Sequence, residues 1–213
     1  MYHEHLEKVV AFASADQFRD ELIKSKADYF GKTGEIHDDD RSFELRMAGF
    51  LDWFIFDRPL AAWQKTPIRL FLDFEGAKLT TPEITPFREF TRTVHSLFEV
   101  RKVKDGEVRV TNLADGVEHK VAERRHMAAV EKGDLLEARL IPFTGALYFS
   151  RAFVFHPREV RKPILAELKR RKKSGQPPVD QEMVWLLSRM ALKTERYTQI
   201  AVENIYRFDG KGL

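Results

Sequence analysis

The sequence predicts an α+β protein in which N-terminal helices, a small central sheet and C-terminal helices follow one another along the chain. Two changes in hydrophobic period indicate this order. Apolar residues recur at helical spacing up to about residue 94, alternate with polar residues from about 95 to 156, and return to helical spacing from 157. With 213 residues, 43% of them hydrophobic, the chain is long enough to bury a core.

Two helices are predicted near the N-terminus. Ser14-Ala15-Asp16-Gln17 has the form of a capping box before a helix from about residue 16 to 30, which Gly31 is expected to end. A second helix from about 41 to 56 is predicted from apolar residues spaced by three and four positions, which are Phe43, Met47, Phe50, Leu51 and Phe54. Because proline is tolerated in a first helical turn, further helices are expected to start at Thr66-Pro67 and at Thr81-Pro82 or Thr85-Pro86.

The segment FLDWFIFDRPL, Phe50 to Leu60, has an unusually high density of aromatic residues. Trp53 and its neighbours make the predicted helix apolar nearly all round, and a helix of this kind is normally buried. Asp57 is predicted to cap a following helix that begins near Arg58, with Pro59 in the first turn. We therefore interpret Asp57 as a cap and not as a catalytic carboxylate.

Five short strands are predicted between residues 95 and 156. Four turn signals separate them, namely Asp105-Gly106, Asp115-Gly116, Gly133-Asp134 and Thr144-Gly145. Because an open sheet of this size would leave unpaired edges, we expect a five-stranded antiparallel small barrel or a strongly bent sheet. The last strand alternates Tyr148, Phe149, Phe153 and Phe155 with other residues, so a sheet face left uncovered by helices would be a partner site.

The C-terminal region, residues 157–213, is predicted to be helical. A helix that includes Val160 and Leu168 runs into a basic segment, and Asp180 is predicted to cap a second, longer helix. We expect the three regions, 1–94, 95–156 and 157–213, to pack together as one compact unit.

Part of the chain resembles proteins of a known type. The resemblance covers roughly residues 40 to 155 and rests on FLDWFIFDRPL, Thr66-Pro67, LFEV at 97–100, Asp115-Gly116, Gly133-Asp134 and ARL at 138–140. These resemble a segment of functionally uncharacterised bacterial proteins with an F-x-D-W-F-x-x-D motif, some of which carry a SEC-C zinc motif. This chain has no cysteine, so the usual SEC-C zinc site cannot form. The resemblance implies a helical layer joined to a small sheet, and it implies no activity.

Several function classes lack their characteristic residues. The absence of cysteine excludes disulfides and thiolate chemistry, and the absence of a long apolar run predicts a cytoplasmic protein that does not enter a membrane. No phosphate-binding glycine loop or nucleophile motif is present, so no catalytic residue, cofactor or metal is predicted. An alternative is a hydrolase or metal-dependent enzyme in which Asp52, Asp57, Asp73 and Glu75 converge.

A basic segment is the main candidate for a binding surface. Residues 156–213 carry 13 basic and 7 acidic side chains, although the net charge of the whole chain is only +3. The eight candidates are Arg158, Arg161, Lys162, Lys169, Arg170, Arg171, Lys172 and Lys173. Cations of this density can neutralise several phosphates, but they are also common at a solvated helix end.

Our leading hypothesis from the sequence is a non-catalytic binding or regulatory module. It would act through the C-terminal basic surface, and through the sheet face if that face is exposed, on a protein partner or a polyanion. The first alternative is a protein that binds the phosphate backbone of a nucleic acid. The oligomeric state is not predicted.

Overall fold

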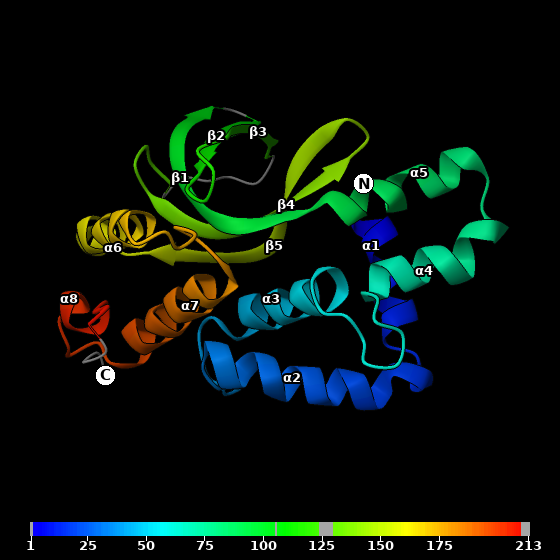
Figure 1. Ribbon diagram of the computed structural model, residues 1–213, viewed down its shortest axis with the longest axis horizontal. Coiled ribbons are helices and arrows are strands. Elements are labelled where there is room, and N and C mark those ends of the chain that lie inside the picture. The colour runs from blue at the N-terminus through cyan, green and yellow to red at the C-terminus, as the bar shows by residue number, and fades with distance from the viewer. Residues whose placement is uncertain (1, 105, 124–129, 210–213) are drawn as a thin grey trace.

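A computed structural model describes residues 2–104, 106–123 and 130–209 of the chain. The predicted α+β order is confirmed, because helices at both ends flank a closed five-stranded barrel (Figure 1). No helix in the described ranges is long and apolar enough to cross a membrane.

Five α-helices precede the barrel. They are α1 (Tyr2–Ala13), α2 (Arg19–Thr33), α3 (Phe43–Phe56), α4 (Pro67–Glu75) and α5 (Thr81–Glu89). Their apolar faces form one aromatic-rich core in which Phe54 and Phe90 are fully buried. The core also includes Ile141 of the sheet, so the helical layer packs directly on the barrel.

Three predicted helix ends differ from the structure. A short 3-10 segment occupies residues 16–18 and receives no side-chain cap, so α2 begins at Arg19. The helix continues through Gly31, where glycine costs only about 1 kcal/mol, and ends at Thr33, which is followed by Gly34 with a φ of 100° that suits glycine. The helix start at Thr66-Pro67 is confirmed, whereas α5 is capped one residue earlier than predicted, by Thr80 in a capping box with Glu83.

Asp57 does not cap a helix, and this prediction was wrong. After α3 the chain turns, Leu60 forms an isolated bridge with Lys65, and the next helix is α4. Asp57 lies at the C-terminal end of α3 and accepts two hydrogen bonds from the Arg139 guanidinium, one from Nη1 at 3.2 Å and one from Nη2. Because Arg139 lies in a barrel strand, this ion pair joins the helical layer to the barrel.

The barrel consists of β1 (Val94–Lys104), β2 (Glu107–Asn112), β3 (Glu118–Ala122), β4 (Leu135–Phe143) and β5 (Ala146–His156). The strands close in the order β1-β2-β3-β5-β4. The predicted five-stranded small barrel is confirmed, with four antiparallel strand pairs, and it differs only in that β3 and β5 run parallel where Val121 pairs with Leu147. A ring of five strands cannot alternate in direction all the way round, so closure requires at least one parallel pair.

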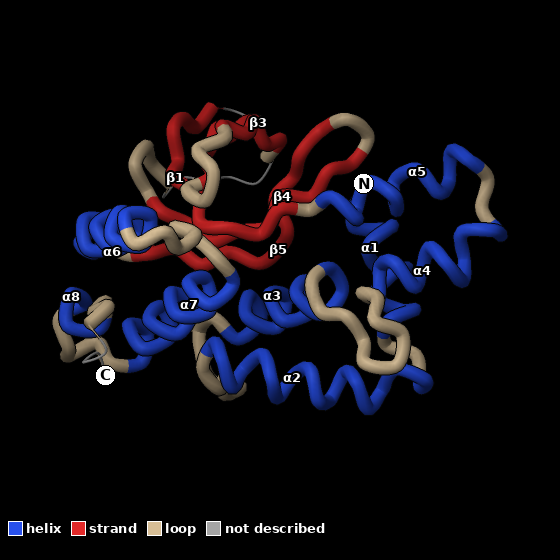
Figure 2. Tube along the Cα trace, viewed as in Figure 1, coloured by secondary structure: helices blue, strands red, loops and turns tan. Residues whose placement is uncertain are grey.

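Helices cover only part of the barrel. α3 packs against β5, and Figure 2 shows the helices below and beside the barrel with none over β2 and β3. The barrel interior is filled by apolar side chains, among them Phe149 and Phe153 of the aromatic last strand. Phe155 of the same strand is 48% exposed.

Three α-helices follow the barrel, α6 (Arg161–Lys173), α7 (Gln181–Arg196) and α8 (Val202–Ile205). They share a second helical core with Leu97 and Leu135 of the barrel strands. The predicted cap of α7 is confirmed, because the Met183 N–H donates to the Asp180 carboxylate at 2.9 Å.

Candidate polyanion-binding surface

The eight basic residues predicted as a binding surface fall into two groups. The four arginines form ion pairs, whereas the four lysines form none within the described ranges. Arg158 pairs with Asp134 and Glu131, Arg161 with Glu99, Arg170 with Glu167, and Arg171 with Asp180. The charge of each arginine is therefore partly neutralised and its side chain is held in place. The lysines are the remaining candidates for binding a polyanion.

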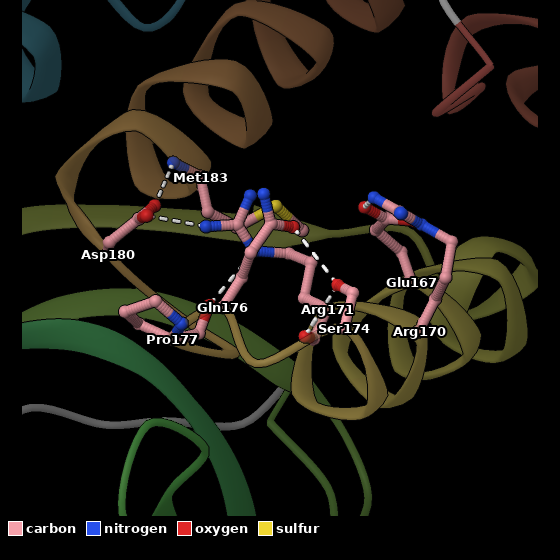
Figure 3. Close-up of polar contacts among 8 residues, drawn as sticks. All are labelled: Glu167, Arg170, Arg171, Ser174, Gln176, Pro177, Asp180 and Met183. Carbon is pink, nitrogen blue, oxygen red and sulfur yellow. Dashed lines mark hydrogen bonds and ion pairs between the residues drawn. The ribbon is translucent and has the colours of Figure 1, made fainter.

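Two of these arginines shape the end of α6 (Figure 3). Arg170 donates to both oxygens of Glu167, one turn earlier in the same helix, at 2.7 Å. Arg171 donates to the Pro177 carbonyl oxygen at 3.0 Å and to the Asp180 carboxylate. Arg171 thereby fixes the loop between α6 and α7 and orients the carboxylate that caps α7.

Replacing Asp180 tests this second role. Asp180→Ala removes both the cap of α7 and the partner of Arg171, so it should lower the free energy of unfolding by about 1–2 kcal/mol, as lost caps do. Asp180→Asn keeps the capping oxygen and should lose less than half as much. Urea titration of both variants measures the difference, and equal losses would contradict a capping role.

The four lysines, Lys162, Lys169, Lys172 and Lys173, are exposed and form no hydrogen bond or ion pair with the rest of the described chain. Lys162, Lys169 and Lys173 are seven and four residues apart, which places them on one face of α6. We call these three the lysine stripe. At 1.5 Å per residue the stripe extends over about 16 Å. Lys169 and Lys173 are four residues apart, a spacing at which like charges repel, and a bound anion would relieve this repulsion.

A second group of cations lies on the barrel and was not among the predicted residues. Lys102 of β1 lies opposite Arg109 of β2, and Arg109 lies opposite Lys120 of β3. The three side chains are therefore neighbours on the outer face of the barrel. We call these three the barrel row. All three are exposed. Glu107 partly neutralises two of them, at 3.1 Å from Arg109 and 2.8 Å from Lys120, whereas Lys102 has no partner in the described chain.

The Glu99 carboxylate joins the start of α6 to β1. One Glu99 oxygen accepts from Arg161 at the start of α6, at 2.7 Å, and the other accepts from Arg101 of β1, at 3.0 Å. The residues that follow are Lys162 of the lysine stripe and Lys102 of the barrel row. The helix that carries the lysine stripe therefore begins next to β1, the strand that carries Lys102 of the barrel row.

The four carboxylates of the alternative enzyme hypothesis do not form one site. Asp73 and Glu75 lie on α4 and form ion pairs with Lys65 and Lys78, at 2.7 and 2.8 Å. Asp57 is bound to Arg139. Asp52 is buried on α3, and this burial raises the pKa of its carboxyl. Within the described ranges, no group of three histidine or acidic side chains could hold a metal ion.

Comparisons with known proteins give one match. A family model described as "Family of unknown function (DUF7986)" matches residues 16–183. No curated protein and no solved structure matches the chain. The match agrees with the resemblance to functionally uncharacterised proteins.

Proposed function

We propose a function for this chain on the premise that it belongs to the family of unknown function DUF7986, whose description assigns no activity. The protein is a non-catalytic binding module, and its ligand is the phosphate backbone of a nucleic acid. The lysine stripe makes the main contact, and the barrel row extends it.

The observation that carries the proposal is the lysine stripe. Its three ammonium groups are exposed on one helix face, and none is held by a carboxylate of the described chain. Lysine binds phosphate as a point charge and reads no base, so it supplies affinity without sequence preference. A stripe of about 16 Å extends along roughly five base pairs of duplex at 3.4 Å per pair.

The barrel row supports the same ligand. Like charges placed directly opposite on neighbouring strands are unfavourable, so a bound polyanion would relieve their repulsion. Small five-stranded barrels of the OB type bind oligonucleotides on the face of strands 2 and 3, where Arg109 and Lys120 lie here. This second argument is an analogy of fold.

The side chains near the cations indicate whether the protein would contact the bases or the backbone of a nucleic acid. No exposed aromatic side chain accompanies these cations: none of the large apolar side chains exposed in the described ranges lies on α6, β2 or β3. Sequence-tolerant binding by base stacking requires aromatic side chains, so the proposed contact is with the backbone. Duplex and single strands of equal charge should therefore bind with similar, salt-sensitive affinities.

A matched pair of triple variants tests the proposal. Replacing Lys162, Lys169 and Lys173 with Gln should weaken binding to a labelled 20-nucleotide strand at least ten-fold at about 50 mM salt, because up to three phosphate contacts are lost. The control replaces Lys8, Lys24 and Lys26, which are exposed on α1 and α2, and removes the same charge. The control should bind like the wild type in fluorescence anisotropy. Equal weakening in both variants would contradict a located site.

A further inference from the structure

A groove of about 290 Å³ lies between the start of α3, the end of β5 and the end of α7. Its walls are mostly apolar and are formed by Leu45, Phe153, Val154, Phe155, Pro157, Ala191 and Leu192, with Ser42, Arg46, Thr194 and Glu195 as the polar members. Leu45 and Phe155 are 44% and 48% exposed. The groove is near the lower end of the size range of small-molecule sites, and its mixture of apolar walls and few polar groups is typical of them.

Arg46 provides a buried positive charge in the groove. Its side chain is only 6% exposed, yet it donates only to backbone carbonyl oxygens, to Thr33 at 2.6 Å and to Ser188 at 3.2 Å. Its Nε has no partner, and it forms no ion pair with any carboxylate in the described ranges. A buried guanidinium that contacts no carboxylate favours an anionic group beside it.

Glu195 provides a negative charge near the same place. One of its oxygens accepts from the Ser42 backbone N–H at 3.1 Å, and no cation of the described chain pairs with it. The Ser42 hydroxyl is buried without a partner. Glu195 also acts electrostatically on Arg46, so the two charges lie within each other's range. One cation, one anion and one hydroxyl-bearing residue therefore line the polar part of the groove, and the Arg46 Nε–H and the Ser42 hydroxyl, which have no partner, are buried beneath its surface.

The charges discriminate between classes of ligand. A ligand with only a carboxylate would be attracted by Arg46 and repelled by Glu195. A ligand with only an ammonium group would be attracted by Glu195 and repelled by Arg46. Glu137, which lines a cavity of about 20 Å³ together with Arg46, likewise repels a carboxylate and attracts an amine. A group that carries both charges on neighbouring atoms satisfies both residues, as expected from electrostatic complementarity.

We propose that this groove binds a free α-amino acid with a large apolar side chain. The carboxylate of the ligand lies over Arg46 and Ser42, and its ammonium group faces Glu195. Its side chain packs against the apolar walls beside Phe155, where it removes exposed apolar surface from water. This site involves none of the lysine stripe or barrel row and is independent of the proposed function.

The ligand class is tested by two-dimensional NMR of the ¹⁵N-labelled full chain. L-Phe, L-Leu and L-Trp, each titrated to about 10 mM, should give saturable shifts of amide signals at the start of α3 and the end of β5, since ligands of this size reach micromolar to millimolar affinity. N-acetyl-phenylalanine, which lacks the ammonium group, and phenylalanine amide, which lacks the carboxylate, should each bind at least five-fold more weakly. Glycine should give no saturable shift.

The position of the binding site is tested with a variant of Glu195, which leaves the buried Arg46 unchanged. Glu195→Gln removes a half-buried charge at the groove and should abolish the preference for L-Phe over N-acetyl-phenylalanine while the spectrum stays folded. The control is Glu182→Gln at the exposed start of the same helix, which should keep the preference. The triple variant of the lysine stripe should bind L-Phe like the wild type. The proposal is overturned if none of the three amino acids shifts the spectrum, or if Glu195→Gln keeps the preference.

Discussion

Asp57→Ala is expected to lower the free energy of unfolding by about 3 kcal/mol, because removing one partner of a buried ion pair leaves an uncompensated charge. Arg139 is only 1% exposed, and without Asp57 it keeps, within the described ranges, a side-chain hydrogen bond to the Thr93 hydroxyl at 2.9 Å and the Phe56 ring 5.1 Å away, neither of which carries a negative charge. Asp57 itself keeps some contact with solvent, so the low end of the range for such pairs applies. Urea denaturation followed by circular dichroism measures the loss.

A double-mutant cycle separates the ion pair from other roles of Asp57. Arg139→Met fills the same space without a charge, so Asp57→Ala should cost much less in that background than in the wild type. If the aspartate acted as a helix cap, the two changes would be additive. Additive losses would therefore contradict the bridge between the helical layer and the barrel.

Trp53→Ala is expected to lower the free energy of unfolding by about 3–5 kcal/mol, as large-to-small changes in cores do. The indole is 8% exposed and lies against two rings, Tyr29 at 5.4 Å and Trp185 at 6.1 Å between centroids. The Arg58 guanidinium lies 5.5 Å from the same ring. The change therefore leaves a cavity where α2, α3 and α7 meet.

The control for Trp53 is an aromatic residue of comparable size at the surface. Trp63→Ala changes a more exposed indole and should cost clearly less. Both variants can be compared by thermal and urea unfolding. A loss of stability for Trp53→Ala no greater than that for Trp63→Ala would contradict the buried position of the aromatic segment.

The elements predicted from local patterns agree best with the structure. The period of apolar residues predicted α3 within two residues of its start, and Asp180 was identified as a cap from its position before an apolar helix. The turn at Thr144-Gly145 separates two strands as predicted, with Gly145 at a φ of 77°. Signals of this kind depend on residues near each other in the chain, so they can be read from one sequence.

The wrong or missing predictions depend on contacts between distant residues. The partner of Asp57 is 82 positions away, and the local sequence around Asp57 favours a cap equally well. The barrel row required the register of three strands, since Lys102, Arg109 and Lys120 are separated along the chain and only pairing aligns them. Likewise, the ion pairs of the four arginines on or next to α6 connect residues that are distant in the chain or depend on the loop geometry, and they leave four of the eight cations, all lysines, without an ion pair in the part of the chain that the structure describes.

The most direct test of the proposed function is the salt dependence of nucleic-acid binding. For the wild type, the logarithm of the association constant should fall linearly with the logarithm of salt concentration, with a slope near −0.9 for each duplex phosphate neutralised. Replacing Lys162, Lys169 and Lys173 with Gln should make that slope less steep by about two to three, and the Lys8, Lys24 and Lys26 control should leave it unchanged. Wild-type protein that binds neither duplex nor single strand at about 50 mM salt, or a slope that is the same in both triple variants, would contradict phosphate binding by the lysine stripe.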